Sequence, residues 1–365
     1  MHLIIDAVNI RSGGGYTHLR NILGNELFIS SFDEVIIFTS KETELRLFKD
    51  KVQSASLTFV TKSFFSGGIV NSICYFIYIQ TTIFFYRKNG ILFSPGGNFY
   101  FTEYITMHRN LLPFDYCQIG KGANLLKVKM ILLKLYLKIV YKFSYKTIFL
   151  NDYCRNVVSN SVKRSYNNLN SMILRHPVSD VCSVKRSFPV LSGDCLKLVY
   201  VGDFLEYKNH VFLRDLLNQW HSVIDFPFLV HFVGISYSNL KKFSELLSEA
   251  KFKYEIHLKL EKNDYVRLLD HVDISLMVSR VESYSQIVSE CIARHLPVIA
   301  LDVSSYKSSF GNSIHYFDGT VEDFNANILK ILKGSDKEMY SDIRDFIQCN
   351  SLDTYCMNLA NFLNA

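Results

Sequence analysis

Several signatures of common site types are missing from this sequence. None of its eight cysteines forms a Cys-x-x-Cys pair, and no histidine joins them at zinc-finger spacing, so we expect reduced, mostly buried thiols. Neither a G-x-G-x-x-G fingerprint nor a Gly-Lys-Ser/Thr P-loop occurs, which argues against dinucleotide or ATP binding. The formal net charge is +6 and no nucleic-acid-binding motif accompanies it, so no nucleic-acid partner is expected. No signal peptide precedes the first apolar segment, which favours a cytoplasmic protein.

What the sequence does contain is two similar halves of alternating strands and helices. At 365 residues, 48% of them hydrophobic, the chain is long enough for two domains. Each half opens with an apolar strand, a glycine-containing loop, a helix and a further strand, the pattern of a parallel α/β sheet. We predict one Rossmann-like domain over residues 1–180, a second over 190–345, a terminal helix within 346–365, and a polar, irregular linker over 177–194. The predicted strands are 2–8, 34–39, 57–60, 91–94, 104–107, 147–150, 196–201, 228–233, 256–260, 273–277 and 297–300.

The most informative motif lies in the last third of the chain. It reads Glu-Ser-Tyr-Ser-Gln-Ile-Val-Ser-Glu from Glu282 to Glu290, and a Leu-Pro-Val-Ile-Ala segment follows it. Ser283 and Gln286 fit a capping box before an apolar pair, which predicts that a helix begins here. The free backbone N–H groups of such a helix start favour a phosphate. Glu282 is expected just before that start and Glu290 about two turns, roughly 10 Å, into the helix. Two carboxylates that bind hydroxyls would then flank one anion site.

This string resembles the Glu-x7-Glu motif of GT-B glycosyltransferases, in particular the retaining family 4 group. The resemblance implies an α/β protein of GT-B architecture, with two Rossmann-like parallel-sheet domains facing across a cleft and a terminal helix that crosses back to the first domain. It also implies a nucleoside-diphosphate sugar as donor, with Glu282 at the sugar hydroxyls and Glu290 at the ribose. The other donor-binding residues suggested by the motif and its flank are Arg280, Ser283, Tyr284, Ser285 and Gln286.

A lysine that fits the same resemblance stands in the segment Tyr-Val-Gly-Asp-Phe-Leu-Glu-Tyr-Lys-Asn, which ends at 209. In the family, a lysine about six residues after the strand-ending glycine holds the donor diphosphate as a point charge, and Lys208 matches that position. The sequence departs from the family at Asp203, where many members have arginine, and at Ser285, where many have glycine. The candidates to supply the missing positive charge are Arg280, Arg175 and His176.

A run of three glycines, Gly13, Gly14 and Gly15, follows the first strand. Glycines let the backbone approach a ligand closely, although a simple tight turn is the alternative. In the family, this loop faces the donor phosphates and the acceptor. Arg11 or His18 could add positive charge there.

His108 ends a predicted strand and begins the segment His-Arg-Asn-Leu-Leu-Pro-Phe. This segment resembles the family pattern His-Asn/Asp-Leu-x-Pro-Phe, in which the histidine points toward the transferred sugar. Without that pattern, a histidine at a strand end would more often just hydrogen-bond a carbonyl group.

Two apolar segments indicate contact with a membrane surface. In Leu125–Phe143, lysines recur every four residues, which on a helix places one lysine stripe beside a broad apolar face. Such a helix suits an anionic cytoplasmic leaflet, and a core-packed helix with one wet face is the alternative. Ile69–Phe85 is a second apolar run, shorter and more polar than the roughly 20 apolar residues of a spanning helix, so we expect it to be buried or interfacial. The lysines of the stripe are Lys134, Lys138, Lys142 and Lys146, and Lys127 and Lys129 precede them.

Together these features predict a retaining, metal-independent glycosyltransferase of hexosyltransferase type, with Glu282, His108 and Lys208 as catalytic residues. No Asp-x-Asp pair occurs, which fits neutralisation of the diphosphate by lysine, helix dipole and backbone amides without a metal or other cofactor. The expected acceptor is a glycan or polyprenyl-linked glycan in surface polysaccharide (for example O-antigen) biosynthesis, at the inner face of the cell membrane. Two alternatives stay open: a GT-B nucleotide-sugar epimerase, and a non-catalytic, membrane-associated scaffold of polysaccharide assembly.

Overall fold

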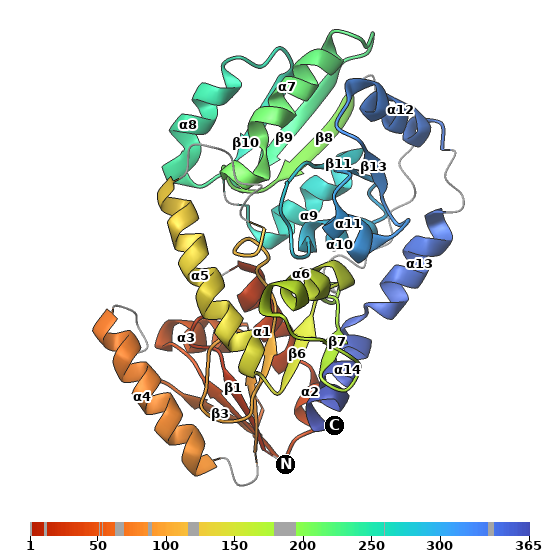
Figure 1. Cartoon of the computed structure of the whole chain (residues 1–365). Helices are drawn as coiled ribbons and strands as arrows, with labels where there is room; N and C mark the ends of the chain where they lie inside the picture. Colours follow the sequence, from red (N-terminus) through yellow and green to blue (C-terminus); the bar gives the residue numbers. More distant parts are fainter. Residues whose placement is uncertain are drawn as a thin grey trace. The chain divides into compact units, whose positions relative to one another are not determined.

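The computed structural model describes the chain apart from residues 1, 11–12, 51, 53, 63–68, 87–89, 116–123, 179–194, 259 and 335–338. Most of the predicted linker over 177–194 therefore lies outside the described residues. The chain divides into two compact units, each built around one parallel sheet with helices on both faces (Figure 1). The N-terminal unit comprises Met1–Phe114, Val128–His176 and Ser351–Ala365. The C-terminal unit comprises Asp115–Lys127 and Pro177–Asn350.

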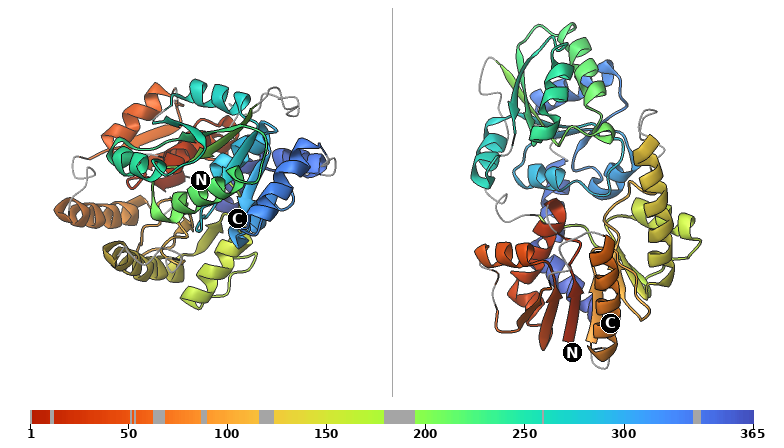
Figure 2. Two further views of the ribbon diagram at one scale, coloured as in Figure 1. Left: turned by 90° about the horizontal axis from the view of Figure 1, so that it is seen from above. Right: turned by 90° about the vertical axis from the view of Figure 1, so that its left-hand side faces the viewer.

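Within the described residues, the N-terminal sheet has the strand order β3-β2-β1-β4-β5-β6-β7, with every pair parallel. Its central strands are almost continuously apolar because helices cover both faces. Right-handed crossovers place α1 and α3 on one face and α4, α5 and α6 on the other (Figure 2). The strands are β1 (His2–Asp6), β2 (Glu34–Phe38), β3 (Leu57–Val60), β4 (Gly90–Ser94), β5 (Ile105–Met107), β6 (Lys146–Phe149) and β7 (Ser171–Ile173). The helices are α1 (Gly13–Leu23), α2 (Glu26–Ile29), α3 (Lys41–Lys49), α4 (Ile69–Tyr86), α5 (Asn124–Phe143), α6 (Asp152–Val162) and α14 (Leu352–Asn364).

The last helix of the chain, α14, belongs to the N-terminal unit. It packs against α2 and β4, and the Asn25 side-chain amide donates a hydrogen bond of 2.8 Å to Asp353. Tyr355, Leu359 and Leu363 are buried on its inner side. The chain therefore completes its first unit with its final residues.

The C-terminal sheet, in the part of the chain that is described, has the order β10-β9-β8-β11-β12-β13 and is also parallel. The chain order reverses direction between β8 and β11, and ligands of such sheets bind at the carboxyl ends of the strands near this point. The strands are β8 (Leu196–Val201), β9 (Phe228–Val233), β10 (Lys253–His257), β11 (Ile274–Met277), β12 (Val298–Leu301) and β13 (His315–Phe317). A 3-10 turn, η5 (Glu206–Lys208), precedes the helices α7 (His210–His221), α8 (Tyr237–Leu247), α9 (Lys262–His271), α10 (Gln286–Ala293), α11 (Ser304–Phe310), α12 (Val321–Leu332) and α13 (Met339–Cys349).

The core of the C-terminal unit is centred on the only tryptophan of the chain. The Trp220 ring is fully buried, packs against Phe228 and Phe324, and donates its indole N–H to Asn325 at 3.0 Å. The hydrogen bond satisfies the one polar atom of this side chain, so its large apolar surface can be buried without leaving an unpaired donor.

The α/β class is confirmed, and all eleven predicted strands are present. The predicted strand 256–260 lies three residues earlier, as β10, and the strands β7 and β13 were not predicted. The prediction that Lys146 belongs to the lysine stripe is wrong. This residue lies in β6 and not on α5, and its buried ammonium group points to the carbonyl oxygen of Phe362 at 3.5 Å. Among the described residues, none of the helices has the length and apolar character that a membrane crossing requires.

Candidate active site

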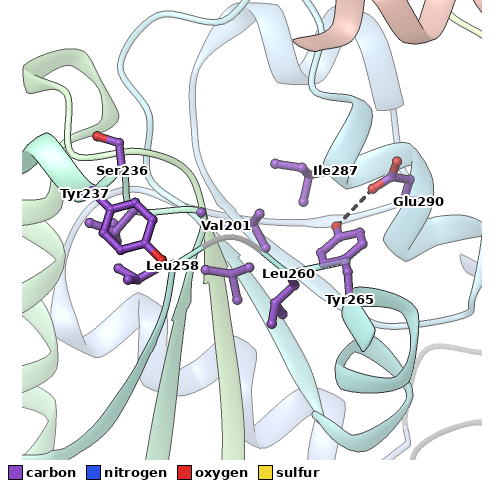
Figure 3. Close-up of a pocket in the computed structure, with 11 residues that line it drawn as sticks. Val201, Ser236, Tyr237, Leu258, Leu260, Tyr265, Ile287 and Glu290 are labelled. Carbon is purple, nitrogen blue, oxygen red and sulfur yellow. Dashed lines mark hydrogen bonds between the residues drawn. The ribbon is translucent and has the colours of Figure 1, made fainter. Parts of the chain in front are cut away.

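A cavity of about 570 Å³ opens at the carboxyl ends of β8, β9 and β10 in the C-terminal unit (Figure 3). Its size lies within the roughly 300–1,000 Å³ that is usual for small-molecule pockets. Most of its wall is apolar, and α10 closes one side with Ile287 and Glu290. A flat, weakly polar ring can therefore pack against this wall, which offers the ring few hydrogen-bonding groups. The other lining residues are Val201, Val233, Gly234, Ile235, Ser236, Tyr237, Leu258, Leu260 and Tyr265.

Glu290 is the carboxylate of this cavity. Its Oε2 accepts a hydrogen bond of 2.9 Å from the Tyr265 hydroxyl, which comes from α9 (Figure 3). Burial raises the pKa of Glu290, and the Tyr265 hydroxyl and the Lys262 charge oppose this rise. A buried carboxylate held by one donor keeps lone pairs for further donors. It is therefore suited to accept hydroxyl groups of a ligand in the cavity.

The predicted capping box is wrong, and so is the distance of two turns between helix start and Glu290. The helix α10 begins at Gln286 and its N-cap residue is Ser285, whose side chain caps no backbone N–H. Ser283 lies before the helix, and Glu290 lies about one turn, roughly 6 Å, along it. The neighbouring Tyr284 is the reason that α10 begins at this position.

Tyr284 is anchored in the core of the C-terminal unit. Its ring packs against Phe310, and its hydroxyl accepts a hydrogen bond of 2.7 Å from Ser289. These contacts hold the segment before α10 in place, and Ser285 has an extended backbone. The N-cap side chain, Ser285, thus binds none of the first N–H groups of α10, and a helix start with free N–H groups attracts an anion. A substrate contact of the Tyr284 side chain stays a prediction.

Lys208 and Glu282 form an ion pair close to the start of α10. The Lys208 Nζ atom lies 2.5 Å from Glu282 Oε1, and their side chains are only 16% and 14% exposed. Burial by itself lowers the pKa of Lys208, but the charge of Glu282 and its hydrogen bond raise the pKa above the usual value. Lys208 is therefore fully charged at neutral pH. The two residues are 74 positions apart in the sequence, and the fold brings them together.

Local backbone contacts hold Lys208 in this position. Asn209 adopts a left-handed conformation, with φ of 63°, which asparagine tolerates better than most residues. Its side-chain amide donates to the Val278 carbonyl at 3.2 Å, and the Arg280 N–H donates to the Tyr207 carbonyl at 2.9 Å. The turn after β8 is thus tied to the loop after β11, which leads to Glu282.

Asp203, where the family often has arginine, has a structural function here. Its Oδ1 accepts hydrogen bonds from the N–H groups of Phe204 and Ser236, at 2.8 and 2.9 Å, and from the Asn239 amide at 3.1 Å. Burial alone raises the pKa of Asp203, but these donors lower it below the usual value. The carboxylate joins the loop after β8 to the start of α8, and an arginine at this position could not accept these hydrogen bonds.

The three candidates for the missing positive charge differ in their surroundings. Arg280 is exposed and forms no ion pair with any residue that the structure describes. His176 lies in the N-terminal unit, where burial, aided by the charge of Arg109, lowers its pKa to about 3, so it carries no charge at neutral pH. Arg175 lies in the same unit beside it. Arg280 is the candidate that shares a unit with Lys208.

The glycine run does not form a loop, contrary to the prediction. Gly13, Gly14 and Gly15 are the first turn of α1. A Cβ atom at Gly15 would lie 2.6 Å from Nη2 of Arg109, which is closer than real Cβ contacts. Glycine is therefore required for the approach of this guanidinium group to the helix. Arg11, the other predicted charge, lies outside the described residues.

Arg109 is a functional candidate that the sequence did not reveal. Burial lowers the pKa of Arg109, its Nε atom has no hydrogen-bond partner, and it forms no ion pair among the described residues. A partly buried guanidinium group next to a helix start favours an anion. The available signal was its place directly after His108 at the end of β5, where a charged side chain is unusual.

His108 lies inside the N-terminal unit. Its side chain is fully buried between the rings of Phe114 and Phe149, and its Nδ1 atom is 3.0 Å from the Tyr141 hydroxyl. Burial lowers the pKa of His108 to about 3, so its ring is neutral. A contact with a sugar stays a prediction, and it requires this ring to become accessible.

His18 is buried as well and supplies no charge at the start of α1. Its Nε2 atom lies 2.5 Å from the Tyr355 hydroxyl of α14, and its ring packs against His176. Burial lowers the pKa of His18 well below the usual value. We refer to His18, His108 and His176 as the neutral histidine group.

Comparison with known proteins places the C-terminal unit in a family. Residues 185–346 match the family model of group 1 glycosyl transferases. This segment is similar to the group 1 glycosyltransferases. It contains Lys208, Glu282 and Glu290, whereas Arg109 and the glycines of α1 lie outside it. No protein with a curated description matches the chain.

Solved structures similar to this chain show that its fold is GT-B. Sucrose-phosphate synthase from Thermosynechococcus elongatus is 12% identical with a TM-score of 0.76, and the match covers 100% of this chain and 98% of that one. HepE from Anabaena in complex with UDP-glucose is 11% identical with a TM-score of 0.70, covering 100% and 99%. WaaB, a lipopolysaccharide outer core galactosyltransferase, is 13% identical with a TM-score of 0.66, again covering 100% and 99%.

Proposed function

We propose that this protein is a retaining, metal-independent glycosyltransferase that moves a hexose-type sugar from a nucleoside diphosphate to a hydroxyl group of a glycan. The observation that carries the proposal is the arrangement of Lys208 and Glu282 beside the uncapped start of α10. On the same helix, Glu290 reaches into an apolar cavity. Lys208 with the helix start, Glu290 and the apolar cavity thus match the diphosphate, the ribose and the base of a donor.

Each part of the donor has a matching group in this site. The base fits the apolar wall formed by β8, β9 and β10, and the ribose hydroxyls donate to Glu290. The diphosphate binds at the N–H groups of α10 and to the ammonium group of Lys208, which turns from Glu282 toward it. Glu282 then accepts hydrogen bonds from the sugar. Arg280 is the candidate for a second positive charge on the departing diphosphate.

In the proposed chemistry, most of the catalytic effect comes from stabilisation of the departing diphosphate. The bond between the sugar C1 and the phosphate oxygen breaks, a bond from C1 to the acceptor oxygen forms on the same face, and the acceptor proton moves to the departing phosphate. Lys208 and the dipole of α10 stabilise the charge that develops on the diphosphate. No protein general base is assigned to this step.

A thermal-shift screen of nucleoside diphosphates and their sugars tests the donor site. UDP is the first compound to test, because HepE binds UDP-glucose. A ligand at roughly 100 times its Kd stabilises the folded state by about 2.7 kcal/mol, so binding raises the melting temperature. We expect Glu290→Ala to abolish the shift and Leu132→Ala, on α5 of the other unit, to leave it unchanged. Equal shifts in wild type and Glu290→Ala would contradict the assignment.

A product assay separates the proposal from its two alternatives. A transferase releases free nucleoside diphosphate rapidly only when the acceptor is present. An epimerase converts the nucleotide-sugar without an acceptor, and a non-catalytic scaffold turns over no nucleotide-sugar at all.

We also propose that the N-terminal unit binds the inner face of the cell membrane, where a polyprenyl-linked glycan of surface polysaccharide biosynthesis is the acceptor. Helix α5 exposes apolar residues at spacings of three and four, which places them on one face. Its accessible lysines suit an anionic leaflet, and each contributes about 1 kcal/mol near the surface. The exposed apolar residues are Val128, Ile131, Leu132, Leu135, Ile139 and Phe143 on α5, Ile73, Phe76, Ile77 and Phe85 on α4, and Phe101. The lysines are Lys129, Lys134, Lys138 and Lys142.

Vesicle co-sedimentation tests the membrane face. The wild-type protein should bind vesicles with an anionic lipid and not purely zwitterionic ones. Leu132→Glu and Leu135→Glu should abolish this binding, while Leu169→Glu, at an 83% exposed leucine elsewhere in the same unit, should retain it. Retained binding in the α5 variants, with unchanged melting temperature, would refute the membrane face.

A further inference from the structure

Three potential metal ligands lie together on the sheet of the C-terminal unit. His231 belongs to β9, and Glu255 and His257 belong to the neighbouring strand β10. Glu255 is paired in register with His231. Because side chains alternate along a strand, Glu255 and His257 point to the same face, and His231 points there beside Glu255.

The donor atoms of these side chains have the spacing of metal ligands. His231 Nδ1 lies 3.1 Å from His257 Nε2 and 3.3 Å from Glu255 Oε2, and the distance from His257 Nε2 to Glu255 Oε2 is 3.6 Å. Zinc bonds to nitrogen and oxygen are about 2.0–2.2 Å long, so two ligands of a tetrahedral ion lie roughly 3.3–3.6 Å apart. Ligands of an octahedral ion with the same bonds would be closer, at roughly 2.8–3.1 Å. The distances of 3.3 and 3.6 Å correspond to the tetrahedral case, and the third, 3.1 Å, lies at the limit of the octahedral range.

We propose that His231, Glu255 and His257 bind a Zn²⁺ ion, with a water molecule as the fourth ligand. Two histidines and one glutamate are a common donor set for zinc. The cluster is open on one side, since the Glu255 side chain is 54% exposed and that of His257 25%, so an ion can enter and keep a water.

The arrangement of the two histidine rings is compatible with one shared ion. Imidazole binds metals through a ring nitrogen, and His231 Nδ1 lies next to the donor atoms of the other two residues. The two rings are stacked with 30° between their planes and 5.3 Å between their centres. Both nitrogens can then point at one ion between them and Glu255.

The position of the cluster indicates a structural role for the ion. Strand β10 is an edge strand, whose only neighbour in the described sheet is β9. An ion held by His231 on β9 and by two residues of β10 would fix this edge. The chain that follows β10 carries Leu258 and Leu260 of the nucleotide cavity, and Val233, two residues after His231, lines the same cavity. Zinc would therefore stiffen one wall of the cavity and would take no part in the transfer reaction.

Calorimetric titration of the untagged, EDTA-treated, full-length protein with ZnCl₂ tests the proposal. We expect one Zn²⁺ per chain and a rise in melting temperature on its addition. Loss of an outer-shell partner alone costs about 10- to 100-fold in metal affinity, so His257→Ala and Glu255→Gln should cost at least about tenfold. His271→Ala removes an exposed histidine of α9 and is the matched control, which should bind Zn²⁺ like the wild type.

Two further measurements test the coordination number of the bound ion and its structural role. Co²⁺ in place of Zn²⁺ should give the intense visible absorption of a four-coordinate site, and this absorption should disappear in His257→Ala. Zn²⁺ should slow hydrogen exchange in residues 253–258 of the wild type and not of His257→Ala. The proposal is overturned if no Zn²⁺ binds, if binding is the same in His257→Ala and Glu255→Gln as in the wild type, or if Co²⁺ shows only a six-coordinate spectrum. Because these readouts need no nucleotide, they are independent of the transferase assignment.

Discussion

The Lys208–Glu282 ion pair offers the sharpest test of the donor site. In the structure, the Lys208 ammonium group is 2.5 Å from Glu282 and both side chains are largely buried. The proposed function requires Lys208 to turn toward the diphosphate. Two substitutions separate its contributions: Lys208→Met removes the cation and keeps the length of the side chain, and Glu282→Gln keeps the shape and removes the competing charge.

The substitutions should change the affinity for UDP and the folding stability by different amounts. A hydrogen bond to a charged group contributes about 1.5–3 kcal/mol, so Lys208→Met should weaken UDP binding by roughly 10- to 150-fold. Glu282→Gln should leave UDP affinity unchanged or raise it, because Lys208 no longer has to leave a counterion, while transfer of the sugar is lost. Breaking a buried pair costs about 3–5 kcal/mol of folding stability, and partial exposure places this pair at the lower end.

Calorimetry with UDP and urea denaturation measure the two effects separately. The double variant should regain most of the stability that Lys208→Met loses, because no charge is left without its partner. Its affinity for UDP should stay as low as that of Lys208→Met. If Lys208→Met bound UDP like the wild type while its stability fell, the lysine would be only a structural partner of Glu282, and the proposed position of the diphosphate would be wrong.

Three further predictions follow from buried groups. Each member of the neutral histidine group has a folded-state pKa below its unfolded value, so stability is present above pH 6.5 and is lost as pH falls. In urea denaturation, His108 and His176 should each account for a loss of about 2 kcal/mol by pH 5. Gly15→Ala should displace the Arg109 guanidinium group and weaken transfer as much as Arg109→Ala does, and normal kcat/KM in both would refute an anion site there. Tyr265→Phe removes a donor that favours the ionised form of Glu290, so the loss of UDP binding on acidification should move to higher pH, and an unchanged pH profile would contradict this role of the hydrogen bond.

Most of the strands could be predicted because burial on both faces makes their sequences largely apolar. The strand β8, for example, begins where the apolar segment begins and ends directly before Gly202. The strands β7 and β13 have three residues each, and each begins with a polar one, Ser171 or His315. Runs this short carry too little pattern to be distinguished from loops.

The site could be predicted where neighbouring residues in the sequence form it, and not where distant segments meet. Glu282 and Glu290 were found because both flank one helix start. The actual start of that helix depends on the burial of Tyr284 against Phe310, which local capping preferences do not contain. Arg109 depends on its approach to Gly15, 94 positions away, and nothing in either local sequence indicates it.

Asp203 shows how the two parts of the donor site depend on each other. Its carboxylate accepts the N–H of Ser236, a residue that lines the nucleotide cavity, so it shapes the wall against which the base is proposed to lie. An arginine at this position would supply charge for the diphosphate but would lose this link between the loops after β8 and β9.

The positive charge must then come from another part of the unit. Arg280 satisfies this condition, because its backbone N–H is bound to Tyr207, the neighbour of Lys208, while its guanidinium group is exposed and unpaired among the described residues. The absence of arginine at position 203 is therefore consistent with the proposed catalysis, in which Arg280 supplies the charge and Asp203 supports the cavity wall.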